Sequence, residues 1–152
     1  MTFQQKDWRA QRVGWVLLAL VLAAGLAGLL GPGPLSSATA SGGDTLHVEY
    51  ERFVRHGSQT HVTVRIAAAE PGPLQLTISR QYLEAFHVKQ ILPAPARVQA
   101  GDPDLVYTFE GPDTAGPVEL KFFLQPESLG SHTGRLSSGL GSAVTLRQFT
   151  YP

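Results

Sequence analysis

The chain has 152 residues, with 12 Lys and Arg, 12 Asp and Glu, and no cysteine. A formal net charge of zero provides no electrostatic basis for binding nucleic acid. Without cysteine, the chain has no disulfides, thiol catalysis, CxxC redox chemistry or cysteine-ligated metal sites.

Residues 13–30 form an uncharged apolar segment that follows a short basic head at residues 1–12. A hydrocarbon core about 30 Å thick requires roughly 17 to 25 apolar residues of helix. Because no polar face interrupts the segment, a helix buried in a protein core is disfavoured. We therefore predict one transmembrane helix over residues 13–30, inserted in the lipid bilayer of the cytoplasmic membrane.

The charges on the two sides of this segment predict its orientation. The head contains three basic residues, Lys6, Arg9 and Arg12. No Lys or Arg follows the segment until Arg52. Because positively charged flanks stay in the cytoplasm, we expect the N-terminus to lie inside the cell and the C-terminal part to be extracytoplasmic.

The sequence leaves open whether this segment is an anchor or a cleaved signal peptide. Ala38-Thr39-Ala40 has the small-x-small form of a signal-peptidase site. The apolar run, however, is longer than the usual h-region of about 7–15 residues, and Ala40 lies ten residues beyond its end. These observations favour an uncleaved signal-anchor, and cleavage after Ala40 is the alternative.

Small residues recur at every fourth position of the apolar segment and define a candidate docking face for another membrane helix. This face consists of Ala19, Ala23 and Ala27, with Ala24 and Gly28 beside them. Small side chains let helix backbones approach closely. The alternative is that the pattern reflects only the abundance of Ala and Gly in apolar segments.

Residues 31–44 are rich in Gly, Pro, Ser and Ala and are predicted to be a flexible spacer. Residues 45–152 are predicted to form one domain, in which alternating apolar residues indicate about seven short strands and no long helix. The expected strands occupy residues 46–54, 62–68, 74–78, 86–92, 105–109, 118–124 and 144–149. Their number matches an immunoglobulin-like or fibronectin-III-like β-sandwich, with a small barrel as the second choice.

The first two expected strands are predicted to form a hairpin around Gly57. This pairing places Val48 opposite Ile66 on the inner face, so that the apolar faces of the two strands coincide. On the outer face it places Glu49 opposite Arg65 as an exposed cross-strand ion pair.

Three further segments are less regular. Residues 80–85 are either an extension of a strand or one helical turn, and the sequence does not decide between them. Residues 96–100 are expected to be a short edge segment. Residues 127–142 are expected to be a Gly/Ser-rich excursion without a strand, in which residues 134–141 form a mobile connection.

No arrangement of side chains in the sequence predicts catalysis or a metal site. The five histidines lack the close spacing of zinc ligands. Glu127, Ser128 and His132 share one Gly/Ser-rich loop, but a catalytic triad requires a fixed geometry that such a loop does not provide. We therefore predict a protein that is not an enzyme and that has no cofactor and no bound metal.

Four aromatic residues are candidates for contact with another protein: Phe53, Phe123, Phe149 and Tyr151. The alternation of the strands predicts that Phe53 points outward, that Phe123 and its neighbour Phe122 point to opposite faces, and that Phe149 and Tyr151 share one face. An exposed aromatic patch on a sheet typically marks a protein contact. The alternative is that these rings close the open ends of the sandwich.

The layout resembles bacterial single-pass membrane proteins that carry a small exported immunoglobulin-like β domain. The matching stretches are residues 33–36 (GPLS), 48–53 (VEYERF) and 148–152 (QFTYP). This resemblance implies no particular activity and no catalytic residues.

These observations lead to two hypotheses about function. The first is a membrane-anchored, non-enzymatic accessory or protein-interaction module on the outer side of the cytoplasmic membrane. Its partner is expected to be another membrane protein or a second copy of the chain. The alternative is a periplasmic binding protein, released by cleavage after Ala40, for a small ligand or a metal.

Overall fold

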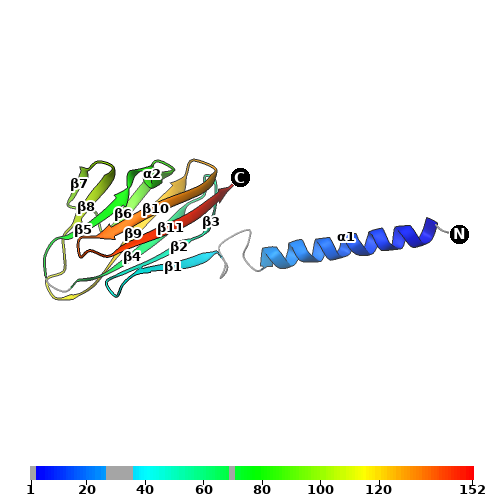
Figure 1. Ribbon diagram of the computed structural model, residues 1–152, viewed down its shortest axis with the longest axis horizontal. Helices are drawn as coiled ribbons and strands as arrows, with labels where there is room; N and C mark the ends of the chain where they lie inside the picture. Colours follow the sequence, from blue (N-terminus) through cyan, green and yellow to red (C-terminus); the bar gives the residue numbers. More distant parts are fainter. Residues whose placement is uncertain (1–2, 27–35, 69–70) are drawn as a thin grey trace. The chain divides into compact units, whose positions relative to one another are not determined.

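The computed structural model describes residues 3–26, 36–68 and 71–152. These residues belong to two compact units, the first ending at Ser36 and the second running from Ser37 to Pro152 (Figure 1). The first unit contains one helix, and the second contains two β-sheets and one short helix.

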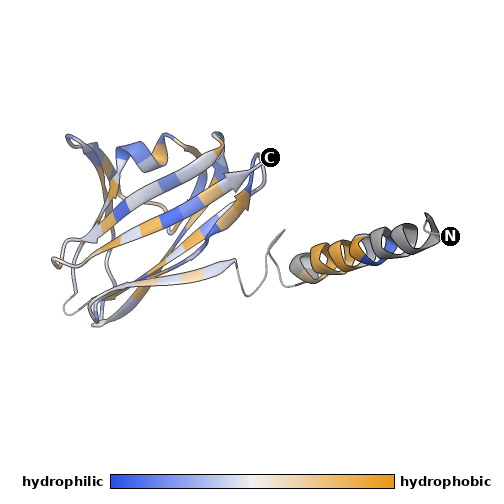
Figure 2. Cartoon of the chain, turned by 45° about the vertical axis from the view of Figure 1, so that its right-hand side comes forward, coloured by the Kyte–Doolittle hydropathy of each residue, from blue (hydrophilic) through white to orange (hydrophobic). Residues whose placement is uncertain are grey.

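The helix of the first unit is α1 (Phe3–Leu26), which contains a largely hydrophobic stretch (Figure 2). The large apolar side chains between Val13 and Leu22 are 52–65% exposed. Among the residues that the structure describes, no helix is both long enough and apolar enough to cross a membrane. Residues 27–30, which end the predicted transmembrane segment, lie outside the described residues.

The second unit is a β-sandwich, which confirms the predicted mainly β architecture. One sheet has five strands in the order β1-β2-β4-β9-β6, and the other has six in the order β3-β11-β10-β5-β8-β7. The five-stranded sheet contains β1 (Ser37–Gly42), β2 (Leu46–Glu51), β4 (Thr60–Ala68), β9 (Gly116–Pro126) and β6 (Phe86–Leu92). The six-stranded sheet contains β3 (Phe53–Arg55), β11 (Ala143–Tyr151), β10 (Gly130–Ser138), β5 (Leu74–Ser79), β8 (Asp104–Phe109) and β7 (Arg97–Ala100).

The two sheets enclose one core, which the alternating sequence creates directly. In β5 and β11 every second residue is buried, and hydrophobic residues alternate with hydrophilic ones along the strands (Figure 2). The largest fully buried side chains include Leu46, Ile66, Phe109, Phe122 and Leu146. Phe122 packs edge-on against Phe109, with ring centroids 6.4 Å apart, so the core also holds an aromatic cluster.

The predicted hairpin around Gly57 is wrong in its connection and its register, although β2 and β4 do pair. Val48 lies opposite Val64, and Leu46 lies opposite Ile66, a shift of two residues from the expected pairing. The chain leaves the five-stranded sheet after β2 and forms β3 in the other sheet before it returns as β4. A shift of two residues keeps every side chain on its expected face, because side chains alternate with a period of two.

The predicted spacer at residues 31–44 contains a strand, which corrects the expected start of the domain. β1 pairs with β2, with Ala38 opposite Tyr50 and Ala40 opposite Val48. Ala38 is only 6% exposed, so the strand contributes to the core. The compact unit therefore begins at Ser37 and not at residue 45. Small Ser, Thr and Ala side chains give a weak hydrophobic alternation, which is why the sequence did not indicate a strand here.

The Gly/Ser-rich excursion predicted at residues 127–142, with a mobile connection at 134–141, is also wrong, because it contains β10. This strand lies inside the six-stranded sheet, between β11 and β5. Gly134 faces the core, where an added Cβ would lie 2.6 Å from Cγ of Tyr82. The glycine therefore makes room for a buried ring and does not indicate flexibility.

The structure decides the segment that the sequence left open. Residues 80–83 form one helical turn, α2 (Arg80–Leu83), which carries the chain from β5 to β6. Tyr82 and Leu83 of this turn are buried. The short segment expected at residues 96–100 is β7, an edge strand with all four residues exposed.

Candidate interaction surface

Three of the four predicted contact aromatics lie together on the outer face of the six-stranded sheet. Phe53 on β3 and Phe149 on β11 are direct partners in the parallel pairing of these strands. Tyr151 follows two residues later on the same face of β11 and is paired with Arg55. We call Phe53, Phe149 and Tyr151 the edge aromatic cluster.

Strand β11 positions this cluster through a regular alternation. Its residues 144, 146, 148 and 150 are buried, so residues 145, 147, 149 and 151 face outward. β3 is held beside it by two backbone hydrogen bonds: the N–H of Phe149 donates to Arg52 O at 2.7 Å, and the N–H of His56 donates to Tyr151 O at 2.8 Å. These bonds fix Phe53 next to Phe149.

The members of the edge aromatic cluster differ in exposure. Phe149 is 46% exposed, although it is a large apolar residue. Phe53 and Tyr151 are half-buried, so Phe53 is on the outer face but less exposed than the sequence suggested. A half-exposed ring beside two further aromatic rings gives this sheet face an apolar surface that contact with another protein would bury.

The fourth predicted aromatic, Phe123, does not belong to this cluster. It lies on the outer face of the five-stranded sheet, opposite His61 on β4 and Gln90 on β6, and it is half-buried. Its neighbour Phe122 is 2% exposed in the core, so the two rings do point to opposite faces, as predicted.

A chain of buried and partly buried hydrogen bonds, which the sequence did not indicate, fixes the point where the backbone passes between the two sheets. The hydroxyl of Tyr82 donates to Oε1 of Gln148, and Nε2 of Gln148 donates to Glu51 O at 2.7 Å. The hydroxyl of Thr60 donates to Oε2 of Glu51 at 2.6 Å. Glu51 is the last residue of β2, so this chain anchors the crossing that places Phe53 on the other sheet.

The outer face of the five-stranded sheet carries charges that neutralise one another. Arg65 bonds to Glu49 at 2.7 Å and to Glu119 at 3.0 Å, and Lys121 contacts Glu119 at 3.0 Å. The hydrogen bond to Glu119 is the main cause of the raised pKa of Arg65. Hydrogen bonds from Lys121 and then Arg65 lower the pKa of the Glu119 carboxyl. The predicted Glu49–Arg65 ion pair is therefore present, but it is diagonal, because Arg65 lies opposite His47 and Glu49 lies opposite Thr63.

Three histidines from different elements surround the turn between β9 and β10, and sequence spacing gave no sign of this. Nε2 of His56 lies 3.3 Å from Glu127 O, and Nδ1 of His87 lies 3.6 Å from the Glu127 carboxylate. Nε2 of His132 lies 3.0 Å from Ser128 O. In the described part of the chain, no group of three His, Cys, Asp or Glu residues is arranged to hold a metal ion.

The geometry of Glu127, Ser128 and His132 is not that of a catalytic triad. His132 faces the backbone carbonyl of Ser128 and not its hydroxyl. The Ser128 hydroxyl instead donates to Ala85 O at 3.5 Å. The ring of His132 lies edge-on to Phe86, with centroids 5.5 Å apart, which is a packing contact.

The predicted helix-docking face is only partly within the described residues. Ala19 and Ala23 are exposed on α1. The backbone of Ala24 is part of α1, whereas Ala27 and Gly28 lie outside the described residues.

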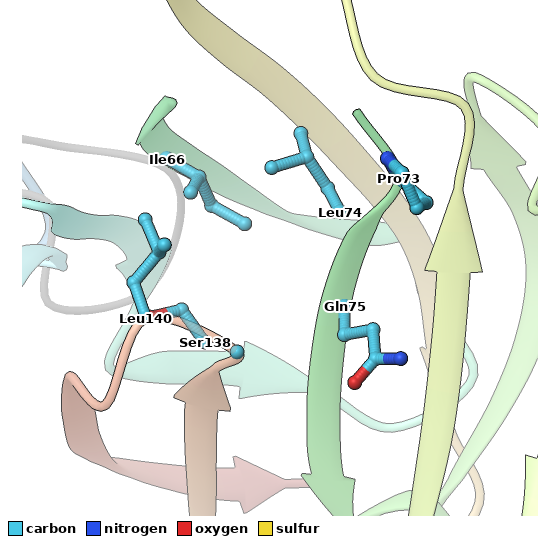
Figure 3. A pocket seen from close by; sticks show the side chains of 7 residues that line it. Ile66, Pro73, Leu74, Gln75, Ser138 and Leu140 are labelled. Carbon is cyan, nitrogen blue, oxygen red and sulfur yellow. The ribbon is translucent and has the colours of Figure 1, made fainter. Parts of the chain in front are cut away.

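A small hollow lies beside the start of β5, next to the turn that joins β10 and β11 (Figure 3). Its volume is about 160 Å³, and Ile66, Leu74 and Leu140 supply its apolar lining. Small-molecule pockets usually measure about 300–1,000 Å³. This hollow therefore fits one apolar side chain better than it fits a small ligand.

No family model matches the chain, and no curated protein matches it. Among solved structures, the chain is similar to a type I cohesin–dockerin complex from Clostridium thermocellum, with 8% identity and a TM-score of 0.40. That match covers 65% of this chain and 90% of the other chain.

Proposed function

We propose that this chain is a membrane-anchored, non-enzymatic protein-interaction module. In this proposal residues 13–30 cross the cytoplasmic membrane with the N-terminus inside. The sandwich, of an immunoglobulin-like or fibronectin-III-like kind, stands outside the cytoplasm and contacts a partner membrane protein. The observation that carries the proposal is the exposed Phe149 beside Phe53 and Tyr151 on one sheet face.

The edge aromatic cluster supports a protein contact for an energetic reason. Burying an exposed Phe side chain contributes about 1.5–3 kcal/mol. Phe149 is about half-exposed, so roughly half of that contribution remains available to a partner. Aromatic residues are enriched at the centres of protein interfaces, where a few of them carry most of the binding energy.

The sequence of the N-terminal unit supports the membrane anchor. Residues 13–30 carry no charge, and the large apolar side chains from Val13 to Leu22 are more than half exposed. A helix that is apolar on all sides requires an apolar environment around it. The basic residues of the head then favour a cytoplasmic N-terminus.

Strand β1 argues against the alternative of a released binding protein. Cleavage after Ala40 would divide β1, which runs from Ser37 to Gly42. It would remove the buried Ala38 and its pairing with Tyr50. An uncleaved chain keeps β1 whole.

The proposal is tested by purifying the full-length chain in mild detergent and measuring its intact mass and its partners together. We expect a full-length mass and one stoichiometric membrane partner. Replacing the exposed ring with Phe149→Ser should reduce recovery of this partner about tenfold, as expected for an interface anchor. The matched control, Phe123→Ser on the other sheet, should leave recovery unchanged. A chain beginning at Ser41, or a partner that Phe149→Ser does not affect, would contradict the proposal.

A further inference from the structure

Three exposed arginines lie on the same sheet face as the edge aromatic cluster. They are Arg55 on β3, Arg147 on β11 and Arg135 on β10, and we call them the arginine strip. Arg55 is paired with Tyr151, Arg147 with Thr133, and Arg135 with Thr145. The strip therefore runs diagonally across three neighbouring strands, from the level of residue 145 to that of residue 151.

The charges of the strip are not neutralised within the described chain. The ion pairs among the described residues involve Arg65, Lys121 and His87, and none includes an arginine of the strip. No Asp or Glu occupies an outward position on β3, β10 or β11. The residues paired with the arginines of the strip are uncharged: Thr133 lies opposite Arg147, Thr145 opposite Arg135 and Tyr151 opposite Arg55.

This excess of positive charge is local and opposes the balance of the whole sandwich. Residues 37–152 contain nine Lys and Arg but eleven Asp and Glu. On the five-stranded sheet, Arg65 and Lys121 are matched by Glu49 and Glu119. Uncompensated arginines on a net acidic unit mark a surface for an anionic partner, since guanidinium groups bind carboxylates in a bidentate way.

We propose that this face binds an extended acidic segment of the partner protein, with its carboxylates on the arginine strip and an apolar side chain on Phe149. The inference rests on the proposed function and names the chemistry of the partner. The proposed acidic segment lies along β11, on the outer face formed by β3, β11 and β10.

The spacing along β11 supports an extended peptide. Alternate residues of a strand are about 7 Å apart and share one face. At four successive levels, residues 145, 147, 149 and 151, the face presents Arg135, Arg147, Phe149 and Arg55. An extended segment also places its alternate residues about 7 Å apart on one face. If these residues are acidic, acidic, apolar and acidic in turn, each lies beside its complementary side chain in this series. Each exposed ion pair is weak, so the match of several levels determines the affinity.

The test measures binding of a fluorescein-labelled peptide to the full chain in non-ionic detergent by fluorescence anisotropy. The probe carries Glu, Glu, Leu and Glu at alternate positions, separated by serines. Arg55→Glu/Arg147→Glu should weaken its binding at least about tenfold, because two attractive pairs become repulsive. The matched control is Lys89→Glu/Arg97→Glu, which makes the same change in net charge. Lys89 and Arg97 are exposed on the edge strands β6 and β7, outside the three strands that carry the arginine strip. It should weaken binding less than about twofold, because exposed charges are screened beyond about 10 Å.

Three outcomes would overturn the inference. The first is an equal loss of binding in both double variants, which indicates a general charge effect. The second is equal binding of a peptide with the same composition but with Leu moved to one end. The third is that the chain fails to bind the peptide but binds vesicles containing phosphatidylserine, and that Arg55→Glu/Arg147→Glu abolishes this vesicle binding. The face would then bind a lipid surface and not an acidic segment. If Phe149→Ser still releases the native partner while the peptide fails to bind, the proposed function stands and this inference fails.

Discussion

At the scale of single residues, the buried ring of Tyr82 leaves no room for a side chain at Gly134. The glycine faces the core on β10, and a Cβ added there would lie 2.6–3.0 Å from three atoms of Tyr82. Tyr82 is itself 2% exposed and cannot move aside easily. We expect Gly134→Ala to reduce the free energy of unfolding by about 1–3 kcal/mol, the usual cost of overpacking.

Urea unfolding followed by circular dichroism checks this prediction on the full chain. Gly116→Ala is the matched control, because the nearest atom to its new Cβ lies 4.0 Å away. A Gly134→Ala midpoint equal to that of the control would show that the Tyr82 ring can be displaced at no cost.

The buried Tyr82 hydroxyl also makes a prediction about alkaline pH. Burial raises the pKa of Tyr82 above its ordinary value of 10.0. Below that value the residue is neutral in both the folded and the unfolded chain. Above it the unfolded chain releases a proton that the folded chain retains, so the free energy of unfolding should fall as pH increases. One such group changes this free energy by up to about 1.4 kcal/mol per pH unit.

The measurement is urea unfolding at several pH values between 8 and 11. Tyr82→Phe should show a smaller decrease above pH 10 than the unmodified chain, because it has no proton to lose at this position. A decrease of the same size in both proteins would assign the alkaline loss to other tyrosines, such as Tyr107, whose pKa burial also raises.

At the scale of elements, β1 makes the boundary of the sandwich testable. Ala38 and Thr39 are adjacent on this strand, but Ala38 is buried and Thr39 is exposed. Ala38→Asn should lower the free energy of unfolding by about 1–3 kcal/mol, because it places an amide in the core without a partner. Thr39→Asn should change this free energy by less than about 0.5 kcal/mol. Equal effects on urea unfolding would mean that β1 does not pack on the core in solution.

The strands that could be predicted are those in which apolar residues alternate over several positions. Leu74, Leu76 and Ile78 indicated β5, and Val118 to Leu124 indicated β9, because period-two alternation is the pattern of a half-buried strand. β1 and β10 contain mainly small and polar residues, so the alternation was too weak to indicate them. β3 has three residues, and two of them fell within the strand expected at residues 46–54, so the sequence did not indicate that the chain changes sheet there.

Of the candidate surface, the sequence predicted only the part that lies on a single strand, β11. Alternation along β11 placed Phe149 and Tyr151 on the same face, as observed. The neighbourhood of Phe53 depends on the chain passing from one sheet to the other, and the arginine strip depends on the order of three strands. Both are consequences of long-range pairing, which is not encoded in local periodicity.

At the scale of the whole molecule, the proposal requires that the helical unit holds the sandwich at the membrane. The test is retention of the full-length chain in the membrane fraction after an alkaline carbonate wash. Leu18→Arg/Leu22→Arg should move the chain to the soluble fraction, because each arginine near the centre of a membrane helix costs about 2.5–3.5 kcal/mol. Both leucines are exposed on α1, at 52% and 59%, so the substitutions leave the fold of the sandwich unchanged.

The matched control is Gln11→Arg, which adds a positive charge in the basic head, outside the apolar segment. It should leave the chain in the membrane fraction, because positive charge is favoured on the cytoplasmic side. Protease added outside spheroplasts should then digest the sandwich and spare the head. Release of the unmodified chain by carbonate would contradict the anchor while leaving the edge aromatic cluster available as a contact surface. Protection of the sandwich from external protease would instead reverse the proposed orientation.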